Sequence, residues 1–345
     1  MNNKLVALSA LALACGAVQA QSSVTVYGSI DLGLLAQSNA GNGTTQVYNG
    51  GIAPSTWGLR GTEDLGGGNK VNFNLESQFA ADTGAGLGPL FRRSSNISIS
   101  SSSMGTLKLG NMYSPAILAF AATDPRGLRE NFSGLFPWVY NSGLSTAGNN
   151  GNNDCGCFLQ NAIEYSNTLG PVGIAGAYSI SETKGSVMSL GLTYSGPVSL
   201  SAAYQAAKFP SSSEEQSVTY SMGAGYAMGA FTGKLNFLHS KNKDATLVET
   251  TKVDVLGLGL DWKTTENNTI GLAYYTGKDK NMVSSTTNSF ILSDEYALSK
   301  RTTLYAQAAF VDAAANASLV SSIVLGGTDA DKNASLFNFG IKHTF

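Results

Sequence analysis

The last ten residues of the chain, LFNFGIKHTF, alternate strictly between apolar and polar side chains. Phe337, Phe339 and Ile341 share one parity, and Asn338 and Lys342 share the other. Successive side chains of a β-strand point to opposite faces, so this pattern predicts a strand with one apolar face and one polar face.

The same two-residue period recurs in about sixteen segments between residues 23 and 345. Three consecutive glycines at 66–68 separate the second and third segments and predict a hairpin turn. The predicted strands are 24–35, 55–63, 70–80, 92–101, 106–112, 161–167, 172–181, 187–195, 198–208, 217–227, 231–241, 252–263, 269–278, 289–299, 302–312 and 336–345.

The connections between these segments alternate in length. Short turns on one rim and long polar loops on the other are typical of an outer-membrane barrel, and an even number of strands places both termini on the short-turn rim. The connections predicted on the short rim are 65–69, 102–105, 168–171, 196–197, 228–230, 264–268 and 300–301.

One parity of each strand is apolar, as in Leu256, Leu258 and Trp262, and the other is small or polar, as in Gly257 and Asp261. In hydrocarbon every backbone N–H and C=O must be paired within the protein, which a closed sheet achieves. Sixteen strands enclose a lumen too wide for side chains to fill, so the lumen holds water. The sequence therefore predicts an all-β, 16-stranded antiparallel transmembrane β-barrel with the polar parity inside.

A soluble β-sandwich, with the apolar parity as its dry core, is the alternative to this barrel. In the barrel, aromatic residues near strand ends on the apolar parity are expected at the two membrane interfaces. These candidates are Trp57, Tyr194, Tyr204, Tyr226, Trp262, Tyr274 and Phe345.

The first twenty residues resemble a secretory signal peptide, with Lys4, an apolar run at 5–14 and the small residues of a cleavage site ending at Ala20. The apolar run is too short to span a bilayer as a helix. Cys15 leaves a lipid-anchored chain as the alternative. We therefore expect a signal peptide at 1–20 and a barrel at 21–345.

Composition and charge narrow the function. Charged residues make up 13% of the chain, against about 25% in soluble domains. Without Lys4 the chain holds 20 basic and 23 acidic residues, a net charge of −3, which gives no reason to expect a nucleic-acid partner. The two histidines, His239 and His343, lack a neighbouring nucleophile motif, so we expect neither an enzyme nor a bound cofactor.

After removal of the signal peptide, two cysteines remain, Cys155 and Cys157. A disulfide that closes a ring across one glycine is strained, so a bonded pair and a pair of ordinary thiols both stay open. Two cysteines without nearby histidines do not predict a metal site.

Several stretches, SSVTVYGSIDLGL, WGLRGTEDLGGGNKVNFNLESQF, GTLKLGN, YALSKRTTLYAQAAF and FGIKHTF, resemble the general diffusion porins of beta-proteobacteria and Neisseria, a family of Gram-negative porins. The resemblance implies a homotrimer of outer-membrane barrels, each with its own pore and with short periplasmic turns and long outer loops. It also implies that the third loop folds inward and that the terminal Phe345 is read by the outer-membrane assembly machinery.

The interruption at about 113–159 stands where this third loop belongs, and loops of such length are usually functional. Its apolar stretch at 117–122 is expected to pack against the inner wall. We expect this constriction loop and the polar parity of the wall to line the narrowest part of the pore. The charges expected there are Asp124, Arg126, Arg129 and Glu130 from the loop, and Arg60, Glu76, Arg92, Lys108 and, by the resemblance, Arg93 from the wall.

This chain departs from the resemblance at Thr56 and Glu164, where related porins often carry inward-pointing arginines. We therefore expect weaker anion selectivity, extending to a mild cation preference. The predicted function is a water-filled channel, surrounded by outer-membrane lipid, for passive diffusion of ions and small hydrophilic solutes. A substrate-selective channel and a barrel that acts as an adhesin or structural protein are the alternatives.

Overall fold

The computed structural model describes residues 23–38, 45–142, 150–180, 183–317 and 331–345. The expected signal peptide lies outside the described residues. Sixteen strands close into an antiparallel barrel, as predicted. They are β1 (Ser23–Gln37), β3 (Thr56–Gly66), β4 (Asn69–Gln78), β5 (Ser94–Ser101), β6 (Gly105–Tyr113), β8 (Phe158–Leu169), β9 (Val172–Ser179), β10 (Val187–Tyr194), β11 (Val198–Lys208), β12 (Glu215–Met228), β13 (Phe231–Lys243), β14 (Glu249–Lys263), β15 (Asn268–Asp279), β16 (Thr287–Ala297), β17 (Thr302–Ala313) and β18 (Asn333–Thr344).

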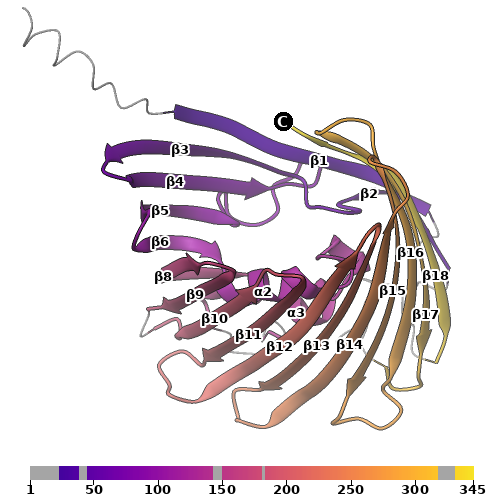
Figure 1. The fold of residues 1–345 in the computed structure, drawn as a ribbon. Coiled ribbons are helices and arrows are strands. Elements are labelled where there is room, and N and C mark those ends of the chain that lie inside the picture. Colours follow the sequence, from indigo (N-terminus) through magenta and orange to yellow (C-terminus); the bar gives the residue numbers. More distant parts are fainter. Residues whose placement is uncertain (1–22, 39–44, 143–149, 181–182, 318–330) are drawn as a thin grey trace, which may run out of the picture.

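The ring closes where the last strand pairs with the first. β18 pairs with β1 from Ser29↔Thr344 to Gln37↔Leu336, and β1 continues onto β3. Each barrel strand therefore has a hydrogen-bonded neighbour on both sides, which is the condition for a sheet to cross hydrocarbon (Figure 1). Two short strands add to the long-loop rim, β2 (Thr45–Asn49) beside β1 and β7 (Asn153–Asp154) beside β8.

The two parities of the strands lie where the barrel prediction puts them. On β14, Leu256, Leu258 and Trp262 are 37%, 46% and 45% exposed, whereas the opposite-parity Val255 is 3% exposed. In a sandwich the apolar parity would be the buried one, so the sandwich alternative is wrong. Of the predicted interface aromatics, Tyr204 is half-buried and the others are exposed.

The segment between β6 and β8 is the largest departure from the strand pattern. It forms the helix α2 (Pro115–Thr123), the 3-10 turn η1 (Glu130–Phe132) and the helix α3 (Leu135–Tyr140), which lie inside the ring of strands (Figure 1). α2 begins at Pro115, and the Ser114 hydroxyl accepts a hydrogen bond from the backbone N–H of Ile117. Within the described part of the chain, no helix is long and apolar enough to cross a membrane.

Candidate functional site: the constriction of the lumen

The described parts of the constriction loop, residues 114–142 and 150–157, lie on the inner wall formed by β10–β16, and small wall residues allow the close approach. A Cβ added at Gly191 would collide with the Pro115 carbonyl oxygen, and one at Gly223 with the Thr123 side chain. A Cβ at Gly259 would lie 2.7 Å from the Pro125 Cβ. Glycine at these inward positions is therefore a steric requirement of the loop's path.

Neutral hydrogen bonds hold the first part of the loop to the wall. The Ser114 hydroxyl donates to Gln205 Oε1 at 2.6 Å, and the Ala116 backbone N–H donates to the Ser189 hydroxyl at 3.0 Å. Thr123 shares a 2.6 Å hydrogen bond with Ser201. Together with the buried apolar face of α2, these bonds confirm that the stretch 117–122 packs inward.

Asp124 does not present its charge to the lumen, contrary to the prediction. Its side chain is fully buried and accepts hydrogen bonds from the backbone N–H groups of Leu128 and Gly134 and from the Tyr275 hydroxyl. Burial raises the pKa of this carboxyl group, and the three donors oppose that shift. Asp124 therefore fixes the shape of the turn after α2.

Arg126 is likewise buried, with 5% of the residue exposed, and it lines a cavity together with Arg129 and Glu295. Its guanidinium donates to Ser293 at 2.6 Å and lies 3.5 Å from Glu295. Arg129 reaches the same carboxylate with two bonds of 3.0 and 2.9 Å, and its side chain is 37% exposed. Glu295, the shared partner, was not among the predicted site residues, although its parity on the predicted strand 289–299 points inward.

Two adjacent arginines, Arg92 and Arg93, lie on the other side of the loop from Glu295. Arg92 and Arg93 precede β5, which begins at Ser94, two residues after the predicted start. Arg93 donates to Glu76 at 2.7 Å and to the Tyr113 hydroxyl, and Arg92 donates to Asp154 at 2.6 Å. The Arg93 backbone N–H donates to the Glu76 carbonyl at 3.2 Å, so Arg93 continues the pairing of β4 with β5, while the Arg92 side chain reaches the loop at Asp154.

Four further predicted residues lie on the wall. Lys108 pairs with Glu164 at 2.8 Å, and Glu164 is 4% exposed, so its inward charge is compensated locally. Thr56 is buried, with its hydroxyl 3.4 Å from that of Ser29. Arg60 has no ion pair within the described residues, and its guanidinium lies 5.0 Å above the Tyr27 ring.

Glu130 is half-buried at the turn that follows Arg129, with a left-handed φ of 38°. Burial raises the pKa of its carboxyl group to about 7, while the nearby charge of Arg93 lowers it and Asp31 raises it. This residue therefore changes its charge near neutral pH.

Cys155 and Cys157 are free and buried at the end of the loop, so the structure has thiols rather than the possible disulfide. The hydrogen bond with Cys155, together with burial, raises the pKa of the Cys157 thiol. Cys155 lies where the loop contacts Arg92, since a guanidinium nitrogen of Arg92 is 3.9 Å from the Cys155 sulfur.

Most of the predicted pore charges thus form ion pairs around the loop. Arg92, Arg93, Lys108 and Arg129 each contact a carboxylate, and the structure does not divide them into one basic and one acidic cluster on facing walls. An arrangement of this kind can narrow a water-filled passage and orient polar solutes, while it leaves only a small net field.

Comparisons with known proteins agree with this architecture. The family described as Gram-negative porin matches residues 7–316. Outer membrane porin protein 32 of Delftia acidovorans is 29% identical over 364 residues, covering 100% of both chains. An outer membrane porin protein of Bordetella pertussis is 38% identical over 144 residues, which is 37% of each chain.

Solved structures show the same fold. The anion-selective porin from Comamonas acidovorans superposes with a TM-score of 0.81 and 25% identity, covering 94% of this chain and 100% of that chain. OmpT of Vibrio cholerae in its trimer form has a TM-score of 0.70 over 94% of this chain and 99% of its own, and at 12% identity it supports the fold alone.

Proposed function

Because the chain belongs to the Gram-negative porin family, we propose that its constriction loop sets a passage with weak charge selectivity in an otherwise general diffusion channel. The protein is an outer-membrane porin with a water-filled channel for ions and small hydrophilic solutes. The observation that carries the proposal is the loop's attachment to the inner wall, with the ion pairs Arg129–Glu295 and Arg92–Asp154 joining loop and wall.

Ion pairing is the reason to expect weak selectivity. A guanidinium group in contact with a carboxylate contributes little net potential beyond a few ångströms, because the two fields cancel. Arg60 remains without an ion pair among the described residues, and Glu130 is partly ionised at neutral pH. The Comamonas relative is described as anion-selective. We propose that this chain shares the sign of that preference in weaker form, with the inward Glu164 neutralised by Lys108.

The functional unit proposed is a homotrimer with three separate pores. The resemblance to general porins implies this assembly, and OmpT of Vibrio cholerae is described in a trimer form. Each chain encloses a complete ring of strands, so each protomer carries its own channel and assembly would not be needed to build one.

Planar lipid bilayers test these proposals. We expect purified protein to insert with three equal conductance steps. In a potassium chloride gradient, the reversal potential should give a chloride-to-potassium permeability ratio above unity but below about tenfold, equivalent to less than ~1.4 kcal/mol. A ratio well above that value, or a preference for potassium, would contradict weak anion selectivity.

The same measurement separates the alternative functions. Conductance that a single sugar or carboxylate blocks saturably would indicate a substrate-selective channel. A protein that inserts without conductance would indicate a plugged barrel with an adhesive or structural role.

A further inference from the structure

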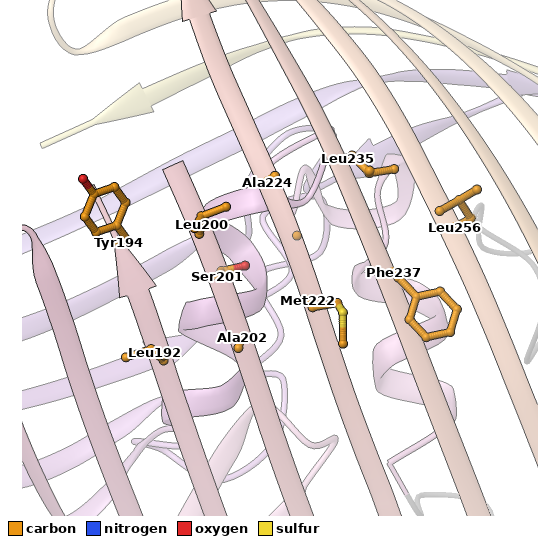
Figure 2. Close-up of a pocket in the computed structure, with 11 residues that line it drawn as sticks. Leu192, Tyr194, Leu200, Ser201, Ala202, Met222, Ala224, Leu235, Phe237 and Leu256 are labelled. Carbon is orange, nitrogen blue, oxygen red and sulfur yellow. The ribbon is translucent and has the colours of Figure 1, made fainter. Parts of the chain in front are cut away.

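The lipid-facing side of the barrel carries an apolar groove across β10–β14, with a volume of about 590 Å³ (Figure 2). Ala202 and Ala224 form its low centre, because their side chains are short and their neighbours are long. Figure 2 shows the groove side chains along these adjacent strands. The large residues that border it are Leu192, Tyr194, Leu200, Met222, Leu235, Phe237 and Leu256.

A row of aromatic and charged side chains lies at one end of the groove. In the strand register Tyr220 pairs with His239, His239 with Asp254, and Asp254 with Lys278. Tyr220, His239 and Asp254 each lie two residues from a groove residue along their strands, and therefore on the same outward face. Lys278 lies on the next strand, β15, and is exposed on that face. The Tyr220 and His239 rings stack with centroids 4.8 Å apart.

A second row, one outward position further, is basic. Lys241 pairs with Lys252 across β13 and β14, and the Lys280 backbone N–H donates to the Lys252 carbonyl at 2.7 Å. This row lies toward the connection at 244–248, on the rim opposite the short turn at 264–268, and hence toward the outer side of the membrane. Three lysines are therefore adjacent on three neighbouring strands.

Only part of this positive charge is compensated on the protein. Glu249 pairs with Lys241 at 3.1 Å, and Asp254 pairs with Lys280 and lies 2.5 Å from His239. Lys252 and Lys278 have no ion pair among the described residues. The two carboxylates are thus engaged, and a net positive charge stays at the outer edge of the groove.

We propose that this groove and the two rows above it form a binding site for a phosphorylated lipid of the outer leaflet. Acyl chains occupy the groove over Ala202 and Ala224, and the phosphate lies beside Lys252 and Lys278 at the level of the headgroups. Burial of apolar chains and attraction of phosphate to lysine both favour such a ligand. A second copy of this chain is disfavoured as the occupant, because it would bring a second lysine row toward the first or leave the lysines buried.

Charge reversal tests the phosphate end of the site. Bisphosphorylated lipid A is titrated into the intact porin in detergent, and its binding is measured by native mass spectrometry. We expect Lys252→Glu combined with Lys278→Glu to weaken binding at least about tenfold, since each lysine near a charged lipid surface contributes roughly a factor of five. The matched control, Lys300→Glu with Arg301→Glu on the short-turn rim, should bind as the unaltered protein does.

Filling the groove tests the acyl end. Ala202→Trp with Ala224→Trp adds two outward-facing rings, changes no charge and should lower lipid A binding while channel conductance stays the same. Equal binding by the charge-reversed protein, or equally tight binding of lipid A stripped of its phosphates, would overturn the proposal. Dissociation of the oligomer by the tryptophan variant would overturn it too, because the face would then be a contact between subunits.

Discussion

Two stretches of the constriction loop hold it to the same wall by different means. The helical stretch, residues 114–123, uses neutral hydrogen bonds to Ser189, Gln205 and Ser201 and lies close over wall glycines. The turn stretch, residues 124–132, uses a buried carboxylate and two arginines that share Glu295. Close packing and neutral hydrogen bonds hold the helical stretch, and charged groups hold the turn stretch. The two stretches should therefore respond differently to substitution, salt and pH.

We expect the largest effect from Gly223→Val, which disrupts the close packing of the helical stretch against the wall. A Cβ at this position would collide with Thr123 and lie 2.7 Å from the Leu235 carbonyl oxygen, which cannot move easily. We expect the free energy of unfolding to fall by about 3 kcal/mol, at the upper end for overpacking, and α2 to shift into the lumen and reduce single-channel conductance.

Gly233→Val is the matched control for this change. Gly233 lies on the neighbouring strand β13, and an added Cβ there has no atom within 4 Å. Urea unfolding and bilayer conductance should both distinguish the two variants. Equal behaviour would show that the loop does not depend on the close approach at Gly223.

Glu295→Gln should have the next largest effect, because it removes the carboxylate from the turn stretch. Arg126, whose side chain is 4% exposed, would lose its charged partner and keep neutral acceptors such as Ser293 and Gln307. We expect a loss of ~2 kcal/mol in the free energy of unfolding, the range for a hydrogen bond to a charged group. The uncompensated guanidinium groups should also raise the chloride-to-potassium permeability ratio.

Glu63→Gln removes the same charge from an exposed position near the short-turn end of β3 and serves as the control. Reversal potentials for the two variants separate a local effect at the loop from a general change in charge. An unchanged ratio in Glu295→Gln would mean that the turn stretch does not face the ion path.

The barrel could be predicted from the sequence because alternation is a local property. The two-residue period located β11 at its observed bounds and placed Arg60, Glu76, Lys108 and Glu164 on inward parities. Parity also reports direction, so it separates lumen from lipid without knowledge of any contact.

The loop could not be predicted in the same way, because residues distant in sequence decide which of its charges are buried and paired. Asp124 and Arg126 look like solvated loop charges until Tyr275 and Glu295 are brought to them from 151 and 169 residues away. Parity could have identified Glu295 as inward-facing, whereas its pairing with two loop arginines depends on the path of the loop.

Ser189→Ala is expected to have a smaller effect and to separate the two stretches most clearly. The change leaves the Ala116 backbone N–H without its 3.0 Å acceptor and removes a 3.1 Å contact with Ser114. We expect a loss of about 1 kcal/mol in urea unfolding and no change in the reversal potential, because no charge is altered. Ser103→Ala, in an exposed turn, is the control. A shifted reversal potential would show that the neutral stretch also sets selectivity.

The smallest expected effect is a pH dependence of selectivity through Glu130 in the turn stretch. Its pKa is raised to about 7 from an ordinary 4.5, so the folded protein favours the protonated form. This contribution to stability is complete below pH 4.5 and is lost as the pH rises through 7.

As the pH rises through 7, the Glu130 carboxyl group also ionises and adds a negative charge near the passage. Raising the pH from about 5.5 to about 8.5 should therefore lower the chloride-to-potassium ratio on the order of twofold at about 0.1 M salt, where screening acts over about 10 Å. Glu130→Gln should abolish the change, while Glu63→Gln should retain it. A dependence that persists in Glu130→Gln would assign the titration to another group.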